Sequence, residues 1–253
     1  DFDIAIPVRE QGTGAEATYN AVISHYDPPW KKSLRDARLM PQIALVDPEL
    51  CVTVPPAVTA ASGMDAITQL IESYVSRKAQ PIPQALCMQG LRLGVPAIAE
   101  AVADGSSRSA RERMSHAALL SGMALANSGL GMAHGVAPAL GTHCRVAHGV
   151  ACAIMLPVAL RFNRDACEEA FARLARVLFD VDPQQSVSDA ADRFIDEIER
   201  LCDRVGVPRR LSDVGVQPDQ IPAIAKDSFG NSMRGNPVDI SEPRLIELLR
   251  ELL

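Results

Sequence analysis

The spacing of apolar residues changes near residue 54 of this 253-residue chain. Up to there, short apolar runs are bounded by turn-forming residues, a pattern typical of strands. Strands are expected within residues 3–7, 18–24 and 43–46, the last one buried and stopped by Asp47-Pro48. Beyond that point, apolar residues recur at spacings of three and four, which is typical of helices. The pattern therefore predicts a mainly α chain whose strands are confined to the first 53 residues.

Start and stop signals divide the later part of the chain into helices. Ser62 is a candidate N-cap, and Ser109 with Glu112 resembles a capping box. Within the apolar helix expected after residue 148, Cys152 is interpreted as a core residue. The expected helices cover residues 57–61, 62–75, 83–103 with a break at 94–96, 109–127, 149–160, 165–179, 187–205, 218–227 and 241–252.

Two histidines share a local sequence that makes them candidate metal ligands. His134 and His148 are each followed by Gly-Val, and neutral imidazole is the commonest protein ligand for metals. A third ligand is required, and Asp65 is the best candidate, with Gln69 one turn later on the same helix face. The alternative is that both histidines are hydrogen-bonded core residues and that Asp65 only favours the start of its helix. Spacing alone favours this alternative for Asp65.

Composition narrows the class of protein. A net charge of -6 without a clustered basic face argues against a nucleic-acid partner. No apolar run of membrane-spanning length and no secretory signal is visible. The six cysteines are scattered without a Cys-x-x-Cys pair, which favours a reducing cytoplasm over a disulfide scaffold. We expect a cytoplasmic protein without a membrane partner, and an aliphatic core because aromatic residues make up only 4%.

Five short motifs together resemble the iron-containing (group III) alcohol dehydrogenase family. They are Gln11-Gly-Thr-Gly-Ala-Glu16, Val46-Asp-Pro-Glu-Leu50, Gly63-Met-Asp-Ala66, Gly129-Leu-Gly-Met-Ala-His134 and His148-Gly-Val. They occur in the family's order over essentially the whole chain. The resemblance implies an all-helical C-terminal metal-binding domain of the dehydroquinate synthase-like fold at residues 54–253. Residues 1–53 would then be a short α/β remnant of the N-terminal nucleotide-binding domain.

The resemblance also implies a ligand set. Asp65, His134 and His148 would bind iron or zinc. Many members have a fourth histidine ligand where this chain has Gln69, which offers a weak carbonyl oxygen or none. Some zinc-binding relatives use one aspartate and two histidines, so three ligands can suffice.

The cofactor and proton-transfer residues are implied in the same way. NAD or NADP would lie beside Gly12, Thr13, Gly14 and Lys31. Many members have a histidine near the substrate four residues after the first histidine ligand. This chain has Pro138 at that position, and His143 is the nearest histidine that could replace it.

The implied function is metal-dependent, NAD(P)-linked oxidation of a small alcohol or reduction of an aldehyde, in a homo-oligomer. A dehydroquinate synthase-like metal-dependent lyase and a non-catalytic helical module are the alternatives, and the Gly-Met-Asp-Ala and Gly-Leu-Gly motifs favour the dehydrogenase. The family's Gly-Gly-Gly-Ser turn for the cofactor pyrophosphate has no counterpart in the sequence. The chain therefore looks truncated at its N-terminus and is expected to be inactive alone, because nicotinamide would not be held against the metal.

Overall fold

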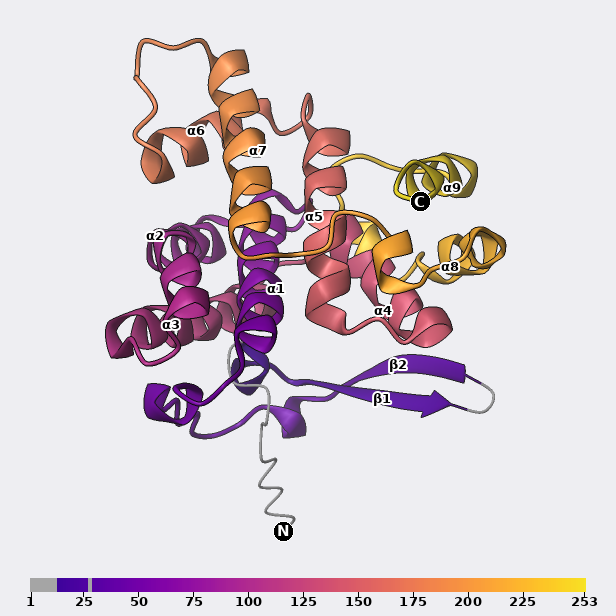
Figure 1. Ribbon diagram of the computed structural model, residues 1–253, viewed down its shortest axis with the longest axis horizontal. Helices are drawn as coiled ribbons and strands as arrows, with labels where there is room; N and C mark the ends of the chain where they lie inside the picture. The colour runs from indigo at the N-terminus through magenta and orange to yellow at the C-terminus, as the bar shows by residue number, and fades with distance from the viewer. Residues whose placement is uncertain (1–12, 27–28) are drawn as a thin grey trace.

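The computed structural model describes residues 13–26 and 29–253, and these are mainly helical, as predicted (Figure 1). Helices surround one long central helix, and a β-hairpin extends along one side of the helical body. The α-helices are α1 (Pro56–Val75), α2 (Pro81–Ala103), α3 (Arg108–Ala126), α4 (Met132–Cys144), α5 (His148–Asn163), α6 (Glu168–Leu178), α7 (Val187–Arg204), α8 (Ile221–Asp227) and α9 (Glu242–Glu251). The short 3-10 helices are η1 (Ala15–Ala17), η2 (Ala37–Leu39), η3 (Pro48–Cys51), η4 (Ser212–Val214), η5 (Pro218–Gln220) and η6 (Met233–Gly235).

The hairpin consists of β1 (Asn20–Tyr26) and β2 (Pro29–Arg35), paired antiparallel so that Ile23 lies opposite Lys32. β1 corresponds to the strand expected at 18–24, whereas β2 escapes the apolar pattern because its central residues are polar. The strand expected at 3–7 lies outside the described residues.

The buried strand expected at 43–46 is wrong. This segment is irregular, and Ile43 and Leu45 are 85% and 87% exposed. An apolar run forms a strand only where a neighbour accepts its backbone hydrogen bonds. The two-stranded sheet of the described residues contains β1 and β2 and does not extend to this segment.

Helix α1 is the centre of the fold. It is one continuous helix, so the two helices expected at 57–61 and from Ser62 onward are wrong in that respect. Every residue from Gly63 to Tyr74 is buried, because α2, α3 and α5 pack around α1 (Figure 1). A helix enclosed on all sides is normally apolar throughout. The polar residues of α1 must therefore find partners inside the protein.

Helix α2 packs one face against α1 and α3. It continues through Pro96, so the break expected at residues 94–96 is wrong. An internal proline removes one helical hydrogen bond. Burial of Leu91 and Ile98 in the core offsets this loss. By length and hydropathy α2 could also cross a membrane, unlike the expectation from sequence, and 44% of its most apolar window is buried inside the protein.

Helix α4 joins α5 through a tight turn in which Arg145 adopts a left-handed conformation with φ 57°. The sequence pattern does not predict α4, because Gly135, Pro138 and Gly141 all disfavour a helix. Tertiary packing overrides propensity here, since most of the helix is buried. The later helices were predicted within a few residues, and Phe171 of α6 stacks on Phe194 of α7 at 5.3 Å between ring centroids.

The closest approach of α5 to α1 depends on the absence of a side chain at Gly149. A Cβ placed there would lie 2.3 Å from the carbonyl oxygen of Ala61 on α1. We expect Gly149→Ala to destabilise the fold by about 1–3 kcal/mol, because backbone atoms must move to relieve the overlap.

Gly141→Ala is the matched control for Gly149→Ala. Gly141 is also helical, but a Cβ there would meet its nearest neighbour at 3.4 Å. It should be neutral or stabilising, because alanine is a better helix former than glycine. Denaturant-induced unfolding of both variants measures the difference. Equal stabilities would show that α1 and α5 can move apart freely.

Candidate metal centre

Four side chains with metal-binding atoms meet at the centre of the helical body. Asp65 comes from α1, His134 from α4, and His148 and Cys152 from α5. One donor atom of each lies within 4.8 Å of the donor atoms of all the others. Three of the four are buried, whereas the His148 side chain is 36% exposed, so His148 is the most solvent-exposed member of the cluster.

His134 bridges two buried carboxylates. Its Nε2 lies 3.0 Å from Oδ1 of Asp65, and its Nδ1 lies 2.8 Å from Oε2 of Glu72. Asp65 and Glu72 are seven residues apart on α1, which places them on the same helix face. A carboxylate at Nδ1 fixes the orientation of the ring and makes Nε2 a better ligand. Sequence reasoning missed Glu72, although its spacing from Asp65 was visible.

Glu72 also caps the helix that carries His134. Its Oε1 accepts a hydrogen bond from the backbone N–H of Ala133 at 2.7 Å. Oδ1 of Asn236 accepts from the N–H of Met132 at 3.0 Å. The residue that precedes α4 is Gly131, which has no side chain to serve as a cap. Two distant side chains therefore satisfy donors that the start of a helix leaves open.

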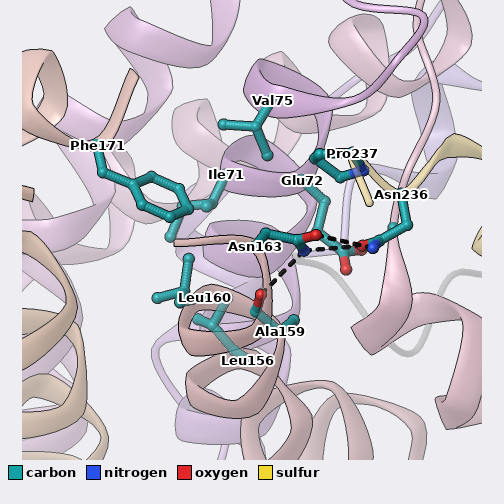
Figure 2. Close-up of a pocket in the computed structure, with 11 residues that line it drawn as sticks. Ile71, Glu72, Val75, Leu156, Ala159, Leu160, Asn163, Phe171, Asn236 and Pro237 are labelled. Atoms are coloured by element: carbon teal, nitrogen blue, oxygen red, sulfur yellow. Dashed lines mark hydrogen bonds between the residues drawn. The ribbon is translucent and has the colours of Figure 1, made fainter. Parts of the chain in front are cut away.

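Asn236 is held in place by Asn163 of α5. Two amide hydrogen bonds join them, from Nδ2 of Asn163 to Oδ1 of Asn236 at 2.9 Å and from Nδ2 of Asn236 to Oδ1 of Asn163 at 2.8 Å. Figure 2 shows this pair beside Glu72, at the edge of a small cavity that is lined mainly by apolar side chains of α1, α5 and α6. The start of α4, and with it His134, is thus fixed by α1, α5 and the loop at Asn236.

His148 and Cys152 are four residues apart on α5 and face the cluster together. Nε2 of His148 lies 3.9 Å from Oδ1 of Asp65 and 3.7 Å from Sγ of Cys152. Cys152 is fully buried, as expected of a core residue, but its sulfur points to the cluster rather than only into apolar surroundings. Sequence reasoning missed this, and the spacing of four from His148 was the available signal.

The protonation of the cluster is strongly perturbed. Burial by itself raises the pKa of Asp65, but the hydrogen bond with His134 and the charge of His148 hold it below its usual value. Burial by itself lowers the pKa of His134, but Cys152, Asp65 and Glu72 together raise it well above its usual value. Burial raises the pKa of the Cys152 thiol to about 12. The directions for Asp65 and His134 both favour a carboxylate paired with an imidazolium.

This donor set fits a divalent metal ion. The carboxylates of Asp65 and Glu72 are only 3% and 5% exposed, and both contact the imidazole of His134. Buried charge of one sign requires a compensating charge nearby. Carboxylate, imidazole and thiol are the donor groups that bind zinc and iron in proteins. Glu72 supplies the outer carboxylate that commonly orients a ligating histidine.

Gln69 contacts α3. Its Oε1 lies 3.2 Å from the Ser121 hydroxyl, whose shorter contact is with the carbonyl oxygen of Ala118 at 2.7 Å. Ser121 in turn lies against Gly14, where a Cβ would be 2.8 Å from the serine oxygen. Gly14 has a left-handed φ of 74°, and its carbonyl oxygen packs directly on Gly122. The turn that precedes η1 is therefore fixed against α3, on the side where Gln69 lies.

The other residues predicted for cofactor binding are only partly described. Thr13 is half-buried next to Gly14. Gly12 lies outside the described residues. Lys31 is on β2, opposite Ser24, and the position of its side chain is outside the described part of the chain.

His143, the residue predicted for proton transfer, is not brought to the cluster. It lies nine residues after His134 on α4, roughly 13 Å further along the helix axis. Its Nε2 lies 2.8 Å from Oδ2 of Asp227, at the end of α8. Its catalytic role stays a prediction.

The fold and the cluster define the class of protein: a helical domain whose buried carboxylate and imidazole groups suit a divalent metal. Residues 59–253 match the C-terminal part of the Fe-containing alcohol dehydrogenase family, and the chain belongs to this family. Its resemblance to that family, inferred from the motifs, is thereby confirmed.

Known members are similar over most of this chain. It is 37% identical to a 1,3-propanediol dehydrogenase from Klebsiella pneumoniae over 236 residues, which are 91% of this chain and 61% of the relative. It is 35% identical to an NAD-dependent methanol dehydrogenase from Bacillus methanolicus, over 86% of this chain and 57% of the relative. A solved structure of a 1,3-propanediol oxidoreductase superimposes with a TM-score of 0.92 at 36% identity, over 96% of this chain and 64% of that one. The chain thus spans about three fifths of the length of these relatives.

Removing Glu72 should destabilise the domain. In Glu72→Ala the backbone N–H of Ala133 and Nδ1 of His134 lose their acceptor in a buried site. We expect a loss of about 3 kcal/mol in the free energy of unfolding, since each buried unsatisfied donor costs about 1–3 kcal/mol. Glu247→Ala is the control, because Glu247 makes only an exposed pair with Arg244 and should matter little. Chemical denaturation compares the two, and similar losses would contradict the capping role.

The stability of the metal-free chain should depend on pH through this cluster. The folded-state pKa of His134 is raised, so its stabilisation is complete below its ordinary value of 6.5 and is lost as the pH rises through the raised value. The pKa of Asp65 is lowered, so its stabilisation is complete above 3.8 and is lost as the pH falls through the lowered value. Both contributions are complete between these two ordinary values.

We therefore expect the melting temperature of the metal-free chain to fall from pH 6.5 upward. A His134→Gln variant, which has no titrating imidazole, should lack that part of the decline. Thermal melts recorded in the presence of a chelator test this, and parallel curves for both proteins would argue against the paired state of His134.

Proposed function

We propose that this chain is the metal-binding part of an NAD(P)-linked alcohol dehydrogenase or aldehyde reductase, with Asp65, His134 and His148 as metal ligands. The observation that carries the proposal is the meeting of donor atoms from α1, α4 and α5 within 4.8 Å in a site enclosed by the core. The NAD-dependent methanol dehydrogenase among the relatives supports a nicotinamide cofactor. Family membership favours this function over a lyase or a non-catalytic helical module.

A divalent ion held by these residues supplies a Lewis acid for the oxygen of an alcohol or aldehyde. Asp65 contributes negative charge, and Glu72 fixes the ring of His134 so that its Nε2 faces the ion. His148 stands at the open side, where a small substrate can reach the cluster. Burial of the other donors excludes water from the remaining sides.

The cofactor is proposed to lie along the turn at Gly12, Thr13 and Gly14, with Lys31 nearby. Support comes from the packing of Gly14 on α3 and from the link through Ser121 to Gln69. Gln69 is one helical turn from Asp65. The turn is therefore connected to α1 near the cluster through Ser121 and Gln69, which suits a reaction that needs cofactor and metal side by side.

The substrate class proposed is a small alcohol or its aldehyde. The relatives are named for 1,3-propanediol and methanol, both small alcohols. The carboxylate and imidazole donors suit iron or zinc.

The experiment has two parts. Metal content is measured in the chain and in His134→Ala, His148→Ala and Gln69→Ala. Both histidine variants should lose tight binding, whereas Gln69→Ala should retain most of it, because a neutral amide oxygen is a weak ligand for iron or zinc.

The chain is also joined to the part of the Klebsiella pneumoniae relative that it does not cover. The chimera should oxidise small alcohols with NAD(P), and His134→Ala should abolish turnover. The chain alone should show negligible turnover. Metal retention in both histidine variants, or chimera activity that survives chelation and His134→Ala, would refute the proposal.

A further inference from the structure

The donor geometry points to Cys152 as a fourth protein ligand of the metal, so that the site is built from one carboxylate, two imidazoles and one thiolate. This inference rests on the metal site of the proposed function and adds a ligand that the sequence motifs do not contain. It also assigns a role to a cysteine that would otherwise be one of several buried thiols.

The distances agree with four donors around one ion, which would take the substrate oxygen as a fifth ligand. Bond lengths of about 2.0 Å to oxygen and nitrogen and about 2.3 Å to sulfur place neighbouring donor atoms about 3.3 Å apart at tetrahedral angles, or about 3.5 Å where one is sulfur. In the structure, Sγ of Cys152 lies 3.7 Å from Nε2 of His148. Oδ1 of Asp65 lies 3.0 Å from Nε2 of His134 and 3.9 Å from Nε2 of His148. The remaining separations among the four donor atoms are within 4.8 Å.

Gln69 is a weaker candidate than Cys152 for the fourth ligand position. Its amide oxygen faces Ser121 on α3, 3.2 Å from the hydroxyl, and a neutral amide oxygen is a weaker donor to zinc than a thiolate. The sulfur of Cys152, by contrast, contacts other candidate ligands: it lies 3.7 Å from Nε2 of His148 and within 4.8 Å of the donor atoms of Asp65 and His134. When Sγ binds the ion, the thiol proton leaves to solvent and the metal–sulfur bond forms in its place.

A thiolate ligand changes which ion the site prefers. Sulfur donors favour soft and borderline ions, and zinc commonly takes mixed sulfur and nitrogen ligands. Cys152 therefore increases the preference for Zn²⁺ over Fe²⁺ relative to a site of oxygen and nitrogen donors alone. It also adds negative charge beside the ion, which offsets part of the Lewis acidity.

The experiment compares the 253-residue chain with Cys152→Ala and with Cys87→Ala as the matched control. Cys87 is also fully buried, but it lies on α2 away from the cluster. X-ray absorption at the zinc edge should show one sulfur at about 2.3 Å in the chain and in Cys87→Ala, and none in Cys152→Ala. Replacement of zinc by Co²⁺ should give a sulfur-to-cobalt charge-transfer band in the same two proteins only.

Zinc affinity should fall by about tenfold or more in Cys152→Ala, since even changes outside the ligand shell cost 10–100-fold. Iron affinity should fall less. Circular dichroism and thermal melts establish that each variant is folded, and Cys152→Ser provides a second variant of closer size should the alanine variant not fold.

The outcomes separate this inference from the proposed function. Stoichiometric metal without a sulfur neighbour, or a cobalt spectrum unchanged in Cys152→Ala, overturns the inference and leaves the site of Asp65, His134 and His148 intact. A chain that binds no metal, or that keeps it in both histidine variants, overturns the metal site and the inference together.

Discussion

The contact on which the structure depends is the bridge that His134 makes between Asp65 and Glu72. Both carboxylates belong to a helix that is enclosed on every side, where an uncompensated charge would be strongly unfavourable. The imidazole satisfies one carboxylate with each ring nitrogen. Helix α4 must begin at the point that delivers this ring, and Glu72 supplies part of its cap. The chemistry of the centre and the position of a helix are therefore set by the same three side chains.

Close backbone contacts bring the remaining parts together. Gly149 lets the start of α5 lie against Ala61, which places His148 and Cys152 opposite Asp65. Gly14 and Gly122 make a similar contact between the N-terminal segment and α3. In both places a methyl group would overlap a carbonyl oxygen. These glycines thus determine how closely α5 approaches α1 and how closely the N-terminal segment approaches α3. The aliphatic core around them maintains that spacing.

Much of the fold could be predicted from sequence because helical periodicity is a local property. The helices from α5 onward follow their apolar spacing and end near their glycine and proline signals. Helix α4 could not be predicted, since its glycines and proline disfavour the conformation that packing imposes. The strand expected at 43–46 failed for the opposite reason: an apolar run alone does not provide a pairing partner.

The residues of the site divide in the same way: some are indicated by local sequence motifs, and others are recognised only from their tertiary contacts. The structure brings Asp65, His134 and His148 together, and the sequence motifs had indicated these three residues. The sequence did not indicate Glu72 and Cys152, because the role of a buried glutamate or cysteine depends on the side chains that it contacts in the folded protein. His143 was near in sequence but is separated from the cluster by the rise of α4 and held by Asp227. Distance along a helix is easily underestimated when only residue numbers are compared.

The exposure of His148 has a consequence for how an ion would enter and leave. His148 is the first residue of α5, and terminal helical turns open far more readily than the core does. Asp65 and His134, by contrast, are 69 residues apart in sequence and are locked between packed helices, so an ion bound to them closes a long chain loop much as a covalent link would. Fraying of a single turn would release one ligand while the others hold. Opening at the start of α5 would then influence the rate of metal exchange, whereas the equilibrium affinity reflects the stability of the whole helical body.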